Sequence, residues 1–212
     1  MQMERIMRIL IDGNDSGLTA RTVPEALEQG MNAVDSAGRI VVEIALDGTP
    51  LDAEQLSNGA YETISAETVA MMSLAPNELL LATFELGRNA IDAAQKHFHS
   101  AAEMIQSGQD ENAMKELHEG IELWCTIDQT VFQEAVPKIA DLGGDQTPDG
   151  LERHVKELKA ALESIKTAIE SSDFAGLSDA LMYEFPETSA GWSTFLGHCS
   201  QVVTSHSELK AE

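Results

Sequence analysis

Histidine and glutamate side chains on two predicted helices carry the donor atoms that a metal ion or a small ligand needs. His97 and His99 flank Phe98 in the stretch AAQKHFHSAAEMI, Glu103 follows His99 by four residues, and His118 lies on the next predicted helix. Imidazole and carboxylate groups are common metal ligands. His97, His99, Glu103 and His118 therefore form a candidate site if the fold makes them converge.

Helical geometry argues against metal binding by the first two histidines. Residues two apart on an α-helix differ by about 200° around its axis, so His97 and His99 cannot bind one ion from the same face. A carboxylate di-iron site needs Glu-x-x-His on two helices, and none of the six histidines has Asp or Glu three positions before it. We therefore favour solvated or edge-packed histidines and expect no cofactor, and the metal or small-ligand site is the alternative.

Other catalytic motifs are absent from the sequence. There is no G-x-x-x-x-G-K-[ST] phosphate loop, no G-x-S-x-G nucleophile elbow and no Cys-x-x-Cys pair. Cys125 and Cys199 fall in different predicted helices, a pattern that favours buried free thiols in a reducing compartment. The sequence thus favours a protein without enzymatic activity, although a catalytic set assembled from distant positions stays open.

Three aromatic side chains gather around a proline in the segment LMYEFPETSAGW, residues 181–192. Pro186 must interrupt the hydrogen bonding of the helix that contains it, and aromatic side chains are enriched at protein interfaces. Tyr183, Phe185 and Trp192 are therefore candidate partner-binding residues. The alternative is that they pack inside the protein around the kink.

Residues 1–72 have the pattern of a small unit with several strands and one helix. The predicted strands lie at 7–13, 16–21, 39–51 and near 60–67. Two of these apolar stretches contain an Asp-Gly turn signal, and Thr22 with Glu25 forms a capping-box pattern at the start of the helix. The resulting order, ββαββ, resembles the β-grasp arrangement.

From Pro76 onward the apolar residues recur at helical spacing, and residues 73–212 are predicted to form an antiparallel four-helix bundle. The first helix has a heptad seam made of Leu80, Phe84, Gly87, Ile91, Ala94, Phe98, Ala101 and Ile105. The third has an apolar stripe made of Leu151, Val155, Leu158, Leu162, Ile165 and Ile169. The predicted helices lie at about 77–107, 111–140, 148–171 and 173–205, the last with a break at Pro186.

Charge restricts the classes of partner. The 212 residues include 36 acidic and 13 basic side chains, for a formal net charge of −23. Such a field repels phosphate backbones and anionic lipid head groups, so we expect neither nucleic-acid nor membrane binding. A basic or amphipathic protein partner suits it, while a solubilising surface or adaptation to high salt would explain the same charge. The chain has neither a signal-peptide pattern nor an apolar run long enough to span a membrane, which favours a cytoplasmic location.

These observations predict an α+β protein with a small N-terminal unit followed by a helical bundle. We expect a non-enzymatic acidic interaction protein, such as an adaptor, a chaperone-like protein or a regulatory subunit, that binds another protein through its bundle. Leu79, Leu81 and Leu86 lie off the main seam of the first bundle helix. They predict either docking of the bundle on the N-terminal unit or a homodimer contact.

Overall fold

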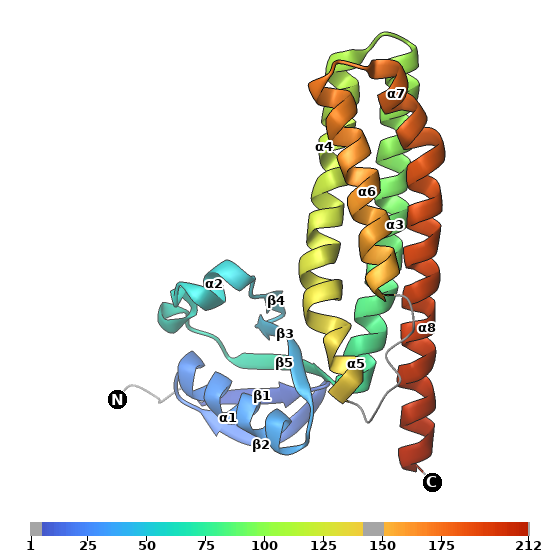
Figure 1. Ribbon diagram of the computed structural model, residues 1–212. Coiled ribbons are helices and arrows are strands. Elements are labelled where there is room, and N and C mark those ends of the chain that lie inside the picture. The colour runs from blue at the N-terminus through green and yellow to red at the C-terminus, as the bar shows by residue number, and fades with distance from the viewer. Residues whose placement is uncertain (1–5, 142–150, 212) are drawn as a thin grey trace. The chain divides into compact units, whose positions relative to one another are not determined.

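A computed structural model describes residues 6–141 and 151–211. Its strands all lie in about the first third of the chain, together with shorter helices, and the remaining described residues are mostly helical (Figure 1). The chain divides into two units, Met1–Leu79 and Leu80–Glu212, where the sequence predicted 1–72 and 73–212. The predicted α+β class is confirmed, because the N-terminal unit contains a five-stranded sheet and the described part of the C-terminal unit is mostly helical.

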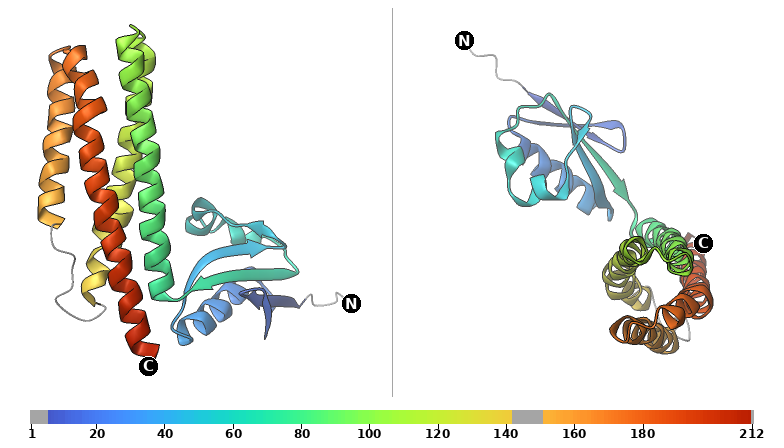
Figure 2. Two further views of the ribbon diagram at one scale, coloured as in Figure 1. Left: turned by 90° about the vertical axis from the view of Figure 1, so that its right-hand side faces the viewer. Right: turned by 90° about the horizontal axis from the view of Figure 1, so that it is seen from above.

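The N-terminal unit packs one helix against its sheet (Figure 2). Its elements are β1 (Met7–Ile11), β2 (Asn14–Ala20), α1 (Val23–Ser36), β3 (Ile40–Leu46), β4 (Thr49–Pro50), α2 (Ala53–Ser57), the 3-10 helix η1 (Ala60–Thr63) and β5 (Thr68–Leu74). The strand order is β2-β1-β5-β3-β4. β5 runs parallel to β1 and antiparallel to β3, and the outer pairs β1–β2 and β3–β4 are antiparallel.

Local signals in this unit act as the sequence predicted. Asp12 and Asp47 adopt positive φ angles of 50° and 48°, and each is followed by a glycine with positive φ. These are the backbone angles that tight hairpin turns require. At the start of α1, the Thr22 side chain accepts a hydrogen bond from the backbone N–H of Glu25, and the Glu25 carboxylate accepts one from the N–H of Arg21.

The strand predicted near 60–67 is wrong. Residues Ala60–Thr63 form a 3-10 helix, and the strand is Thr68–Leu74. A capping box between Asp52 and Gln55 starts a short helix just before this segment, and Gly59 turns the chain with a φ of 72°. The segment with α2 and η1 carries the chain from β4 to β5, which lies parallel to β1. Parallel strands need a long crossover connection of this kind and cannot be joined by a tight hairpin.

In the described part of the helical unit, long helices run alongside one another (Figures 1 and 2). Its described elements are α3 (Pro76–Gln106, whose first turn lies before the division), α4 (Asp110–Ile127), the π-helix η2 (Asp128–Ala135), α5 (Pro137–Asp141), α6 (Leu151–Glu170), α7 (Phe174–Asp179), the π-helix η3 (Ala180–Glu184) and α8 (Phe185–Ala211). Residues 148–150 of the predicted third helix lie outside the described residues. No helix in the described ranges is both long and apolar enough to cross a membrane.

The sequence predicted a break in the last helix at Pro186, and the structure has no such break. The residue lies in the first turn of α8, and the π-helix η3 directly precedes it. The N–H of Phe185 donates to the carbonyl of Ala180, five residues back. A proline is tolerated in a first helical turn. The backbone therefore changes from π-helical to α-helical hydrogen bonding before Pro186, and the helix does not break.

The core of the helical unit confirms the predicted seam of its first helix. All eight seam residues are buried: Leu80, Phe84, Gly87, Ile91, Ala94, Phe98, Ala101 and Ile105. Gly120 of α4 lets the Phe98 ring approach closely, because a Cβ there would lie 2.4 Å from Phe98 Cε1. The seam residues and their partners on the other helices form one continuous apolar cluster.

Candidate functional site

The histidines predicted as a metal or small-ligand site lie beside separate carboxylates. Each imidazole is beside one carboxylate: His97 beside Glu116 at 2.8 Å, His99 beside Glu103 at 3.4 Å, and His118 beside Glu122 at 3.1 Å. Only the first pair joins two helices. Within residues 6–141 and 151–211, no group of three or more His, Cys, Asp or Glu side chains could hold a metal ion.

The three predicted partner-binding aromatics have different environments. Tyr183 is 68% exposed, whereas Phe185 and Trp192 are fully buried. Phe185 packs edge-on against Phe98 at 4.6 Å between ring centroids and against Trp124 at 5.6 Å. Burial of Phe185 among core aromatics favours the packing alternative for that residue.

The most buried row of α6 is offset from the apolar stripe that the sequence predicted, and the stripe packs against the margin of the core. Its buried residues are His154, Ala161, Ile165 and Ala168. Of the predicted stripe, only Ile165 is buried, while Leu151, Val155, Leu158 and Leu162 are half-buried and Ile169 is 41% exposed. Small side chains therefore face the core, and the largest apolar residues of the helix lie at its margin.

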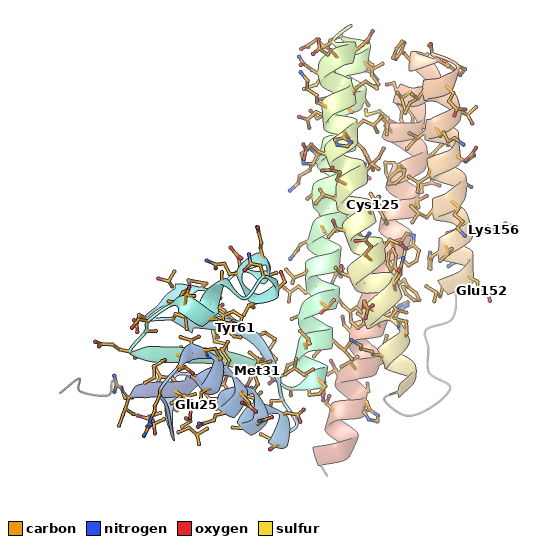
Figure 3. The ribbon with its side chains drawn as sticks, turned by 90° about the vertical axis from the view of Figure 1, so that its left-hand side faces the viewer. Glu25, Met31, Tyr61, Cys125, Glu152 and Lys156 are labelled. Atoms are coloured by element: carbon orange, nitrogen blue, oxygen red, sulfur yellow. The ribbon has the colours of Figure 1, made fainter. Side chains whose placement is uncertain are left out.

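These marginal residues form one wall of an apolar groove of about 400 Å³. We call it the α4–α6 groove, and it is lined by Ile121, Trp124, Cys125, Asp128, Gln129, Phe132, Gln133, Val155, Leu158, Lys159, Leu162 and Trp192. One wall is α4 with η2, the other is α6, and Trp192 comes from α8. Figure 3 shows Cys125 on α4, with Glu152 and Lys156 on α6.

Aromatic stacking shapes the groove around Trp192. The Phe132 ring stacks on the Trp192 indole with centroids 3.9 Å apart, and Phe195 meets the indole edge-on at 5.6 Å. The indole nitrogens of Trp124 and Trp192 are buried and have no hydrogen-bond partner among the described residues.

The polar residues of the groove leave one cation without a carboxylate partner. Gln133 Nε2 donates to Asp128 Oδ2 at 2.7 Å, which ties these two side chains to one another. Lys159, on the opposite wall, has no carboxylate within 4.0 Å among the residues that the structure describes. The groove thus has an apolar interior and an acid and a base on opposite walls.

The two cysteines differ sharply. Cys125 is exposed and lines the groove, contrary to the buried thiol that the sequence favoured. Cys199 is fully buried in the apolar core, and its burial raises the pKa of the thiol to about 12. A thiol reagent will therefore react first with Cys125, because the thiolate is the reactive form and access is required.

The fold and the groove together define a class: an α+β protein whose acidic helical unit exposes an apolar surface between two helices. A family described as a domain of unknown function (DUF8042) matches residues 85–195, and the chain belongs to it. All residues that line the α4–α6 groove lie within the matched range. No curated protein and no solved structure matches the chain.

Sequence reasoning assigned the apolar groove residues of α6 to the core, expected Cys125 to be buried and did not single out Phe132. The signal that distinguishes them is a second row on α6, offset from the stripe, with the small residues Ala161 and Ala168. Helices approach closely through small side chains, so the row of alanines is as good a candidate for the core face as the row of leucines.

Proposed function

We propose that this protein is a non-enzymatic, acidic interaction protein that binds another protein through its helical unit. The observation that supports this proposal is the α4–α6 groove, where Leu158, Leu162 and Phe132 are only half-buried. Burying such side chains is favourable by about 25 cal/mol per Å² of apolar surface, and apolar grooves between helices are a recurrent site for amphipathic partner helices.

The acidic balance supports a basic or amphipathic partner. Residues 80–212 contain 23 acidic and 9 basic side chains, and complementary charge steers association and disfavours nucleic acid and anionic membranes. A cytoplasmic location belongs to the same proposal, as does a role as an adaptor, chaperone-like protein or regulatory subunit. A homodimer formed through the groove is a competing use of the same surface.

We further propose the finer fold classes. The strand order β2-β1-β5-β3-β4 with α1 packed on the sheet supports a β-grasp-like N-terminal unit. The long helices α3, α4, α6 and α8, joined by one apolar cluster, support an antiparallel four-helix bundle. A bundle offers partner surfaces in the grooves between adjacent helices, so this class is consistent with the proposed function.

A photo-crosslinking amino acid at Gln129 tests the proposal. Gln129 is exposed and lines the groove, whereas Gln201 is exposed on α8 and does not line it. In cells that naturally make the protein, we expect a protein adduct from position 129 and not from position 201. The purified partner must then bind the wild-type chain at least tenfold more tightly than the Leu158→Gln variant. Equal binding of the purified partner to both chains would refute the proposal.

A further inference from the structure

We propose that the α4–α6 groove seats a single amphipathic helix of the partner, with its basic flank along α4 and η2. This inference rests on the proposed function and adds the shape, length and charge pattern of the bound segment.

Spacing on both walls matches a helical occupant. The apolar residues of the first wall are Ile121, Trp124 and Phe132, and those of the second are Val155, Leu158 and Leu162. Groove residues on the first wall span the 13 positions 121–133, about three helical turns. A helix that inserts apolar side chains at i, i+3 or i+4, and i+7 fills a groove of this kind.

A segment from another molecule is the better occupant than residues 142–150 of this chain. Their sequence, LGGDQTPDG, contains one large apolar residue, two acids and a proline. This composition provides no apolar helical face. The apolar stripe of α6 packs at the margin of the core and stays half-buried, so it has apolar surface left for a partner.

The helices that form the two walls differ in charge, and of their acidic and basic residues Asp128 and Lys159 line the groove. Residues 110–135, which form α4 and η2, contain seven acids (Asp110, Glu111, Glu116, Glu119, Glu122, Asp128 and Glu134) and one base (Lys115). Helix α6 is balanced, with four acids (Glu152, Glu157, Glu163 and Glu170) and four bases (Arg153, Lys156, Lys159 and Lys166). A bound helix is therefore expected to place Lys and Arg on the flank toward α4, with mixed charge on the flank toward α6.

The groove carries its own reporters. The chain has two tryptophans, and both line the groove, so tryptophan emission responds to occupancy without an added label. Cys125 also lines it, while Cys199 is fully buried. Protection of Cys125 from N-ethylmaleimide is a second measure of occupancy, independent of fluorescence.

The experiment titrates the full chain with three tryptophan-free 18-residue peptides. The first has leucine at helical spacing and lysine elsewhere, the second has glutamate in place of lysine, and the third has the composition of the first in an order without an apolar face. We expect a saturable emission change with the first peptide, affinities at least tenfold lower for the other two, and slower alkylation of Cys125 by at least threefold.

Variants locate the binding. Leu158→Gln is expected to weaken the lysine peptide at least tenfold, and Leu123→Gln, on α4 but outside the groove, to leave it within twofold. Because Leu158→Gln also touches the core margin, the exposed pair Gln129→Lys in the groove and Gln201→Lys outside it provides a second test. Only the first of this pair is expected to weaken binding.

Several results would overturn the inference. Equal binding of the lysine and glutamate peptides would refute the charge pattern, and unchanged binding to both groove variants would show that the peptide binds elsewhere. A second copy of the chain would be the occupant if Cys125 became protected as the protein concentration rose without peptide, and if the protein then had twice the mass of the monomer. The last case is that no peptide binds, while the crosslinked partner binds the wild type and Leu158→Gln weakens that binding. The helical occupant would then be refuted, and the proposed function would stand.

Discussion

At the scale of single residues, His154 is a buried titratable group next to Trp192 of the groove. Its ring lies 5.4 Å from that of Trp192 and 5.5 Å from that of Phe195, between centroids. Burial, and secondarily the charge of Arg153, lowers the pKa of His154 below its ordinary value of 6.5, although Glu157 opposes the shift. The folded protein therefore prefers the neutral imidazole.

This preference predicts a pH dependence of stability. The stabilising contribution is fully present above the unfolded pKa, about 6.5, and is lost as the pH falls through the lower folded pKa. We expect the Tm of the wild type to fall more between pH 7.5 and pH 5 than the Tm of His154→Gln, whose side chain does not titrate. Parallel pH profiles of the two proteins would contradict the assignment.

Gly120 predicts a steric effect on stability. An alanine Cβ at this position would lie 2.4 Å from Phe98 Cε1 and 2.7 Å from Cδ1, so the buried ring or the helix must shift. We expect Gly120→Ala to lower the free energy of unfolding by about 1–3 kcal/mol, measured by urea denaturation. Gly197→Ala is the control, because nothing lies within 4 Å of its Cβ and alanine favours the helix.

At the scale of elements, α6 has two apolar rows of which only one is covered. Ile165 is 2% exposed, whereas Leu158 is half-buried beside the groove. We expect Ile165→Ala to lower the free energy of unfolding by about 2–4 kcal/mol. Leu158→Ala should lower it by about half as much, because Leu158 buries less apolar surface in the folded protein than Ile165 does. Equal losses in urea denaturation would mean that Leu158 is as well packed as the core.

The other wall of the groove is partly π-helical. η2, residues Asp128–Ala135, supplies Phe132 and Gln133 to the groove. π-helical segments are rare and occur frequently at functional sites. The wider π-helical turn changes which side chains point into the groove. A prediction from α-helical periodicity alone would therefore assign residues after Asp128 to the wrong face of the helix.

At the scale of the whole molecule, the net charge of −23 predicts a response to salt. Like charges over the surface repel one another, and ions screen this repulsion over about 10 Å at 0.1 M and 3 Å at 1 M. We expect the Tm to rise between 0.05 M and 1 M potassium chloride. A Tm that is unchanged or lower in 1 M salt would contradict self-repulsion as a destabilising force in this protein.

Local interactions account for what the sequence by itself determined. The Asp12-Gly13 and Asp47-Gly48 turns, the Thr22 cap and the seam of α3 depend on neighbouring residues or on the periodicity of one helix. The acidic charge follows from composition. These features need no knowledge of the remaining chain, and the structure has them where the sequence predicted them.

Long-range packing decided the rest. The position of β5 depends on parallel pairing with β1, which is more than 50 residues away in sequence. The face of α6 depends on whether leucines or alanines meet the neighbouring helices, and both rows have helical spacing. Three branched aliphatic side chains that the sequence assigned to the core therefore form a wall of the groove: Val155, Leu158 and Leu162. A helix determines which side chains share a face, whereas only its neighbours determine which face is buried.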